Sequence, residues 1–107
     1  MRQAVIVSYA RTGLAKAARG GFNNTSNMDM LGHAVQHAVA RSKVDPAEVE
    51  DVIAGCVAGS GNVARAAALL AAPKIPTPGV TLRRAGSSGL KALAAGARHT
   101  LRGGARI

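Results

Sequence analysis

The sequence predicts an α/β fold with three mostly parallel strands and alternating helices. Three short apolar runs, at residues 4–8, 51–57 and 79–83, have the length and the apolar content of buried strands. A segment with apolar residues at helical spacing lies downstream of each run. Strands that alternate with helices typically lie parallel in one sheet, because each helical crossover lets the next strand run in the same direction.

A long loop separates the first strand from the first helix. Residues 4–8 read Ala-Val-Ile-Val-Ser, whereas residues 11–27 carry glycines and asparagines without any periodicity. A helix then begins where Ser26 or Asn27 can cap it, with Asp29 in the first turn, where the helix dipole favours a negative charge. The expected apolar face of this helix comprises Leu31, Ala34, Val35, Ala38 and Val39.

The second strand lies between two helical segments. Asp45 can cap a single turn that begins at Pro46, because proline fits the first position of a helix. Residues 51–57 are apolar on both faces, as parallel strands usually are. Asn62 can cap a helix that runs to about Ala72, and three prolines then end it: Pro73, Pro76 and Pro78.

The third strand, at residues 79–83, turns at Ala85-Gly86 into the last helix. Ser87 or Ser88 begins this helix and Gly103-Gly104 ends it. Residues 104–107 look like the approach to a fourth strand, so we expect one partial domain over residues 1–107, truncated before that strand. The expected buried stripe of the last helix comprises Leu90, Leu93, Ala94, Ala97 and Leu101.

Charge and composition restrict the class of protein. The 107 residues carry 14 Lys or Arg against 5 Asp or Glu, a net charge of +9, and Ala (23) is as frequent as Val, Leu, Ile and Phe together. We therefore expect a thin core. No apolar run is long enough to span a membrane, no secretory signal is visible, and the single cysteine, Cys56, excludes an internal disulfide. A cytoplasmic protein with no membrane partner is expected.

A basic chain suggests a nucleic-acid partner, but the residue pattern argues against a specific one. The basic residues are scattered, and only Arg83 and Arg84 are adjacent. Proteins that bind single strands combine a basic groove with aromatic stacking platforms, and the aromatic residues here are Tyr9 and Phe22. We expect no specific nucleic-acid partner. A basic polyanion-binding module stays an alternative function.

Three possible sites have simpler explanations. His33 and His37 lie one helical turn apart, but a zinc site needs three or four protein ligands, so we expect a solvated or hydrogen-bonded pair and no metal. Cys56 lies in an apolar strand, where a thiol behaves as a small hydrophobic group. The glycine-rich residues 55–61 match neither the phosphate-binding loop nor the dinucleotide-binding motif, and predict only a strand-to-helix turn.

The turn before the last helix is the most informative stretch. A strand runs into a tight turn and then into a helix N-terminus that is rich in small residues. The unpaired N–H groups and the dipole of such an end would lower the pKa of a thiol placed there, which suits a nucleophile. The residue at this place is Gly86, which has no side chain.

Many segments of the chain match one protein family in order and in register. They include residues 4–12 with their Ala-Arg-Thr turn, Gly21-Phe22, residues 32–35 and 37–39, residues 44–52, Gly55-Cys56-Val57, Asn62 with Ala64-Arg65 and residues 67–69, residues 78–81, residues 87–90 and residues 103–105. Together they resemble the N-terminal part of the thiolases, the acetyl-CoA acyltransferase family.

The resemblance implies a reaction and a substrate class. Thiolases cleave a 3-ketoacyl-CoA with free coenzyme A or condense two acetyl-CoA, so coenzyme A thioesters of fatty acid metabolism are the expected substrates, with no covalently bound cofactor. The family's nucleophilic cysteine stands just before Ser-Ser-Gly-Leu. Gly86 occupies that position here, so no catalytic residue is assigned. Cys56 matches a buried strand cysteine of the family, and Ser87 lacks a base that would make it a substitute.

Length is a second departure from the family. A complete thiolase has two similar halves, and this chain corresponds to about a quarter of one. The Gly-His-Pro histidine that activates the nucleophile and the Cys-x-Gly-Gly-Gly cysteine that moves a proton are missing. We therefore expect a truncated, inactive fragment, or alternatively one subunit of a split thiolase that another chain completes. The reaction direction and the acyl chain length stay open.

The resemblance also implies a dimer or tetramer, which this sequence should weaken. The family's third strand, here near residues 80–84, meets its two-fold mate at the sheet edge, and Arg83 stands where the family has Asn. Like charges that face each other across an interface repel. The family's opening strand pairs with a fourth strand, so we expect residues 4–8 to present an unpaired apolar edge that promotes association.

Overall fold

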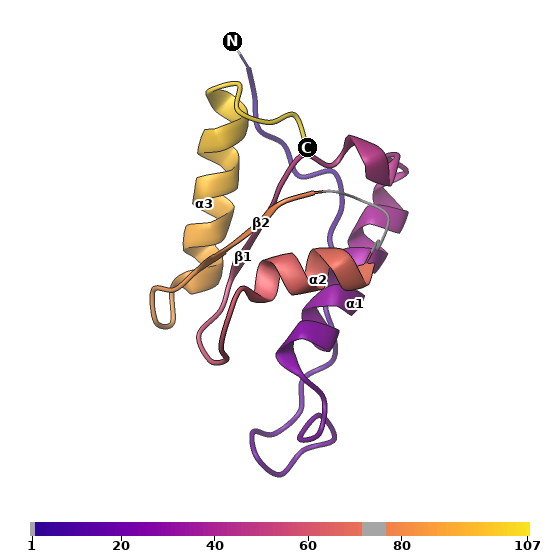
Figure 1. Cartoon of the computed structure of the whole chain (residues 1–107), viewed down its shortest axis with the longest axis vertical. Coiled ribbons are helices and arrows are strands. Elements are labelled where there is room, and N and C mark those ends of the chain that lie inside the picture. Colours follow the sequence, from indigo (N-terminus) through magenta and orange to yellow (C-terminus); the bar gives the residue numbers. More distant parts are fainter. Residues whose placement is uncertain (1, 72–76) are drawn as a thin grey trace.

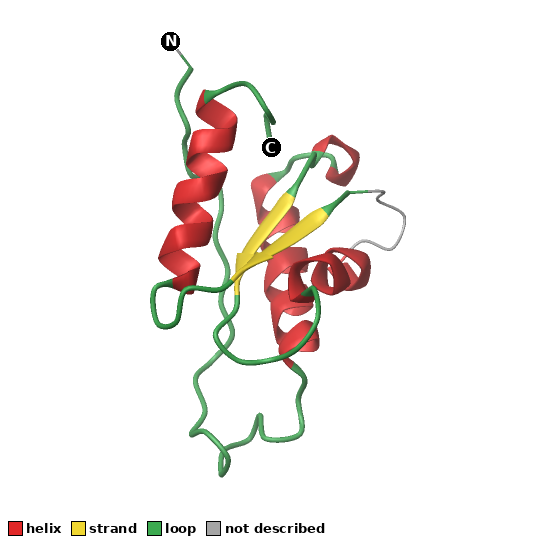
Figure 2. Cartoon of the chain, turned by 60° about the vertical axis from the view of Figure 1, so that its left-hand side comes forward, coloured by secondary structure: helices red, strands yellow, loops and turns green. Residues whose placement is uncertain are grey.

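Two parallel strands, β1 (Val52–Gly55) and β2 (Gly79–Leu82), form the sheet in a computed structural model that describes residues 2–71 and 77–107. The register pairs Val52 with Gly79 and Gly55 with Leu82. Helix α2 (Val63–Ala71) connects the two strands, and both therefore run in the same direction (Figure 2).

Helices cover both faces of the two strands. Helix α3 (Ser88–Leu101) packs on one face, and α2 packs on the other, against β1 and β2 (Figure 1). Helix α1 (Asn27–Ser42) packs against α2 in an outer layer. The single-turn 3-10 helix η1 (Pro46–Glu48) leads from α1 toward β1. The predicted α/β class, with parallel strands and alternating helices, is confirmed.

The predicted first strand, at residues 4–8, does not form, and this expectation was wrong. The segment runs alongside α1, where Ser8 Oγ donates to Ala38 O (2.8 Å). No backbone ladder joins it to β1 or β2 within residues 2–71 and 77–107. A β-branched run becomes a strand only where a neighbouring strand pairs its N–H and C=O groups. The run is therefore an extended chain rather than a sheet edge, and the side chains of Val5, Ile6 and Val7 are 66–73% exposed.

Local side-chain signals set the ends of α1. Ser26 caps it as predicted, because its Oγ accepts a hydrogen bond from Asp29 N (3.0 Å). Gly32 lets the helix approach α2 closely, since a Cβ there would lie 3.0 Å from Leu70 Cβ. Lys43 follows the helix in the left-handed region, with φ of 62°, a conformation that glycine adopts at no steric cost.

Replacing Lys43 with Gly is expected to raise the free energy of unfolding by about 1 kcal/mol, because the left-handed conformation strains any residue with a Cβ. The side chain is exposed, so little packing is lost with it. Urea unfolding measures the effect. Lys43→Ala, which keeps the Cβ, is the control, and a Gly variant no more stable than this Ala variant would contradict the prediction.

Capping side chains also begin η1 and α2 as predicted. Asp45 Oδ1 accepts from Ala47 N (3.0 Å), and Asn62 Oδ1 accepts from Arg65 N (3.3 Å). Asn62 also joins α2 to β2, because its Nδ2 donates to Gly79 O (2.7 Å). The predicted end of this helix, at Ala72, Pro73 and Pro76, lies outside the described residues.

A Schellman motif ends α3, as the glycine pair predicts. Gly103 has φ of 78°, and its N–H donates to Thr100 O (3.0 Å). Gly104 N donates to His99 O (2.9 Å). These two bonds satisfy carbonyl groups that the end of a helix would otherwise leave unpaired.

The buried face of α3 differs from the predicted stripe. Ser88 and Ala92 are buried, whereas Leu90, Leu93 and Leu101 are 48–72% exposed. Helix α3 rests on the strands through its small residues, because only small side chains let its backbone come close to β1. The prediction that the leucines face the core was therefore wrong.

The interior of the described chain is built from small side chains, as the alanine-rich composition predicts. Its buried apolar residues are Ala54, Cys56, Val63, Ala64, Ala67, Ala68, Ala92 and Ala105. Thr77 is buried next to them, and its hydroxyl donates to Val49 O (2.8 Å).

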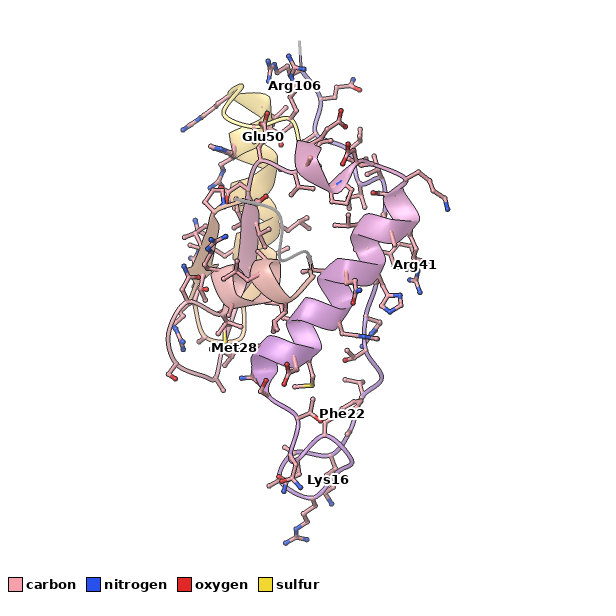
Figure 3. The ribbon with its side chains drawn as sticks, turned by 45° about the vertical axis from the view of Figure 1, so that its right-hand side comes forward. Lys16, Phe22, Met28, Arg41, Glu50 and Arg106 are labelled. Atoms are coloured by element: carbon pink, nitrogen blue, oxygen red, sulfur yellow. The ribbon has the colours of Figure 1, made fainter. Side chains whose placement is uncertain are left out.

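The last residues of the chain lie beside the segment that precedes β1. Glu50 N donates to Ile107 O (2.7 Å), and Arg106 N donates to Glu50 Oε2 (2.8 Å). Figure 3 shows Glu50 and Arg106 together at one end of the molecule, opposite the loop that carries Lys16 and Phe22.

Candidate functional site

The turn between β2 and α3 is held by one buried hydroxyl. Ser88 is fully buried at the start of α3. Its Oγ accepts from Arg84 N (2.7 Å) and donates to Ala85 O (2.7 Å). Ser87 Oγ donates to Arg84 O (2.9 Å), so the N-cap residue does not cap α3 with its side chain. The hydroxyl groups of Ser87 and Ser88 thus both hydrogen-bond within the turn and fix its shape.

Gly86 lies at the exposed tip of this turn. A Cβ built on Gly86 would meet no atom within 4 Å, and its φ lies outside the left-handed region. A side chain at this position would therefore project into open space at the N-terminus of α3. The preceding residue, Ala85, has φ of 45°, a conformation that costs a residue with a Cβ about 1–2 kcal/mol.

The N-terminus of α3 is pressed against the end of β1. A Cβ on Gly55 would lie closer than 3.0 Å to the backbone of Ser88 and of Gly89, which a packed structure does not allow. Glycine is required at this close approach. The turn at residues 83–87 is therefore placed by direct backbone contact between α3 and β1.

Arg83 ties the end of β2 to the connection that follows β1. Its Nη2 donates to Gly59 O (2.7 Å), and Asn27 Nδ2 donates to Ala58 O (2.6 Å) in the same connection. Gly59 and Gly61 both have positive φ, as the predicted strand-to-helix turn requires. The sequence did not predict this role for Arg83, because a contact between residues 24 positions apart leaves no local signal.

Cys56 is buried next to this turn, as predicted. Its Sγ donates to Ala58 O (2.8 Å). A groove of about 500 Å³ opens beside it at the carboxyl end of β1, which is where open α/β sheets commonly bind ligands. Two of the lining residues, Arg11 and Thr12, belong to the stretch that the sequence predicts only as a loop. Only their Ala-Arg-Thr resemblance could have marked them.

No histidine lies close to Gly86. His99 follows Ser88 by 11 residues in α3, a separation of about 16 Å along the helix axis. His33 and His37 are on α1, in the outer layer. The turn thus places Gly86, which has no side chain, at the N-terminus of α3, and no imidazole lies within hydrogen-bond reach of this position to act as a base.

Residues 2–71 and 77–107 contain no group of three or more His, Cys, Asp or Glu side chains that could hold a metal ion. No helix formed by these residues is both long enough and apolar enough to cross a membrane.

Known sequences resemble the chain over its whole length. A family model described as "Thiolase, N-terminal domain" matches residues 4–107. The 3-ketoacyl-CoA thiolase of Vibrio vulnificus (strain YJ016) is 38% identical over 112 residues, which cover 100% of this chain and 29% of that protein. The peroxisomal 3-ketoacyl-CoA thiolase 5 of Arabidopsis thaliana is 39% identical over 94 residues, or 84% of this chain and 21% of that protein.

Solved structures share the fold. The crystal structure of the Bacillus anthracis acetyl-CoA acetyltransferase superposes with a TM-score of 0.90 at 31% identity, covering 98% of this chain and 27% of that one. A thiolase from Ascaris suum in complex with coenzyme A superposes with a TM-score of 0.86 at 26% identity, over 95% of this chain. The chain thus spans less than a third of the length of the proteins that it matches.

Proposed function

The chain belongs to the thiolase family, whose N-terminal domain matches residues 4–107, and on this premise we propose that it is the N-terminal part of an acyltransferase for coenzyme A thioesters. Its relatives are named 3-ketoacyl-CoA thiolase and acetyl-CoA acetyltransferase. These names support thiolytic cleavage of a 3-ketoacyl-CoA or condensation of acetyl-CoA as the family reaction. The cytoplasmic location stays a prediction, and plant relatives are named peroxisomal.

We further propose that Gly86 holds the position of the family's nucleophile, and that the 107-residue chain by itself has no thiolase activity. One observation carries this proposal. The Ser88 hydroxyl holds the turn into α3 through two hydrogen bonds, yet the exposed residue at the tip of that turn is a glycine without a side chain. Covalent acyl transfer needs a nucleophile there and a base within hydrogen-bond reach. Cys56 does not replace the missing nucleophile, because its thiol is buried and donates a hydrogen bond to Ala58 O.

The pure chain is expected to cleave acetoacetyl-CoA with free coenzyme A no faster than buffer does. Gly86→Cys is also expected to give no thiolysis, because the thiol gains no imidazole base. Loss of the absorbance of the acetoacetyl-CoA enolate, with a complete thiolase as positive control, measures both. Turnover by the unmodified chain would contradict the assignment of Gly86, and turnover by Gly86→Cys alone would contradict the need for a separate base.

A split enzyme is the second candidate, and the exposed apolar surface of α3 favours it. Leu90, Leu93 and Leu101 are 48–72% exposed, whereas the core formed by residues 2–71 and 77–107 contains few large apolar side chains. A second polypeptide that supplied the histidine and the other cysteine could cover this surface. Activity of Gly86→Cys that appears only when such a chain is added would support the split enzyme over the isolated fragment.

A further inference from the structure

Two imidazole rings lie close together on the exposed side of α1. His33 and His37 are four residues apart, and their ring centroids lie 4.4 Å apart with the planes inclined by 60°. Residues at i and i+4 lie one above the other on a helix surface. Both side chains are exposed, and neither ring makes a hydrogen bond within the described residues. These are the features of a pair that is open to a shared external ligand.

We propose that His33 and His37 form a two-imidazole chelate for a divalent cation of the late first-row series, such as Ni²⁺, Cu²⁺ or Zn²⁺. Imidazole nitrogen is a preferred ligand of these ions, whereas Mg²⁺ and Ca²⁺ prefer oxygen. Water would complete the coordination, because both rings face solvent. The proposal concerns a surface site and is independent of the proposed acyltransferase function.

The charges on the same face of α1 are compatible with a bound cation. Asp29 lies one turn before His33 and adds negative charge on that side. Arg41 lies one turn after His37, and its Nη1 donates to Tyr9 O (3.1 Å), a neutral acceptor that leaves its positive charge in place. The stretch of α1 that carries both rings runs between the labelled Met28 and Arg41 (Figure 3). Asp29 is not itself a third ligand here, since no group of three candidate side chains is present among the described residues.

The sequence alone predicts a solvated pair, since zinc sites usually take three or four protein ligands. The helix favours binding more than the ligand count suggests, because it holds the two rings close together before the ion binds. Once one ring has bound the ion, the second is already held next to it, and its binding becomes an intramolecular step with a high effective concentration. An i, i+4 pair on a helix can therefore bind an ion more tightly than a single exposed histidine does.

Equilibrium dialysis of the untagged 107-residue protein against Ni²⁺ tests the chelate, with Mg²⁺ as the hard-cation control. We expect one Ni²⁺ per chain and no Mg²⁺ at this pair. His33→Gln and His37→Gln should each weaken Ni²⁺ binding by at least about tenfold. His99→Gln, at the far end of α3, should leave it unchanged.

A rearranged variant controls for composition. His33→Gln combined with Gln36→His keeps three histidines but places two of them at adjacent positions, which point about 100° apart around the helix. It should bind Ni²⁺ as weakly as His33→Gln alone. Binding as tight as in the unmodified chain would overturn the proposal, as would single variants that bind normally, because the ion would then be held elsewhere.

A second readout does not depend on dialysis. Ni²⁺ bound across one turn of α1 stabilises the folded chain over the unfolded one, so it should raise the urea midpoint of the unmodified chain and not that of the rearranged variant. Far-ultraviolet circular dichroism verifies that each variant keeps its helices. Equal midpoint shifts in both proteins would overturn the chelate even where dialysis detects binding.

Discussion

Gly55→Ala is expected to lower the free energy of unfolding by more than about 3 kcal/mol, which is a large fraction of the stability of a small domain. The new methyl group would overlap the backbone of Ser88 and Gly89 at the start of α3. Backbone atoms in a helix cannot swing aside as a flexible side chain can, so α3 must move off β1. Urea unfolding followed by circular dichroism measures the loss.

Gly89→Ala is the matched control for this substitution. Gly89 lies across the same contact, but a Cβ on it would meet no atom within 4 Å. Alanine is the better helix former, so Gly89→Ala should leave the chain as stable or raise its stability by up to about 1 kcal/mol. If both variants lost stability equally, the loss would come from removing a glycine in general and not from close packing. The close approach of Gly55 to the backbone of α3 would then be contradicted.

The thiol of Gly86→Cys is expected to react with iodoacetamide at pH 7 roughly tenfold faster than an ordinary exposed thiol. It would lie at the N-terminus of α3, where the helix dipole stabilises the thiolate and lowers the pKa of the introduced group. The backbone accepts the substitution, because the position is open and lacks a left-handed φ. Peptide mapping by mass spectrometry separates this thiol from Cys56, which should react far more slowly because it is buried.

Ala17→Cys supplies the exposed comparison, since residue 17 lies in the loop before α1 and is exposed. A rate for Gly86→Cys equal to that of Ala17→Cys would show that the helix end does not activate the thiol. Fast alkylation together with absent thiolysis would separate the two requirements of the family's chemistry, an activated nucleophile and a base, on one chain.

Local signals predicted the elements whose ends depend on one or two neighbouring residues. Ser26, Asp45 and Asn62 cap the helical segments that they were expected to cap, and Gly103 ends α3. Such contacts join residues a few positions apart, so their geometry is encoded where it is used.

Features that depend on distant partners were predicted less well. Residues 4–8 have strand composition, but a strand also needs a paired neighbour, and none of the described residues provides one. The leucines of α3 follow the correct helical period, yet the sheet contacts the opposite, small-residue face. The spacing of apolar residues identifies an apolar stripe on a helix, but it does not tell which face of the helix a neighbouring element covers.

The turn into α3 was predicted from the sequence, including the vacant place at Gly86. Its supports were not, because they come from other segments: the buried Ser88 hydroxyl, the glycine at the end of β1, and the bond from Arg83 to Gly59 O. The close approach of the His33 and His37 rings was likewise not predictable, because it depends on side-chain rotamers that their spacing alone does not fix.

The alanine-filled interior also governs how the chain responds to temperature. The heat capacity of unfolding grows with the apolar surface that unfolding exposes to water. Among the described residues, six of the eight buried apolar side chains are alanines, and many larger apolar side chains are already exposed. Its stability curve should therefore be flatter than is usual for this length. Warming and cooling would change the population of the folded chain gradually, and a calorimetric transition would be broad and low.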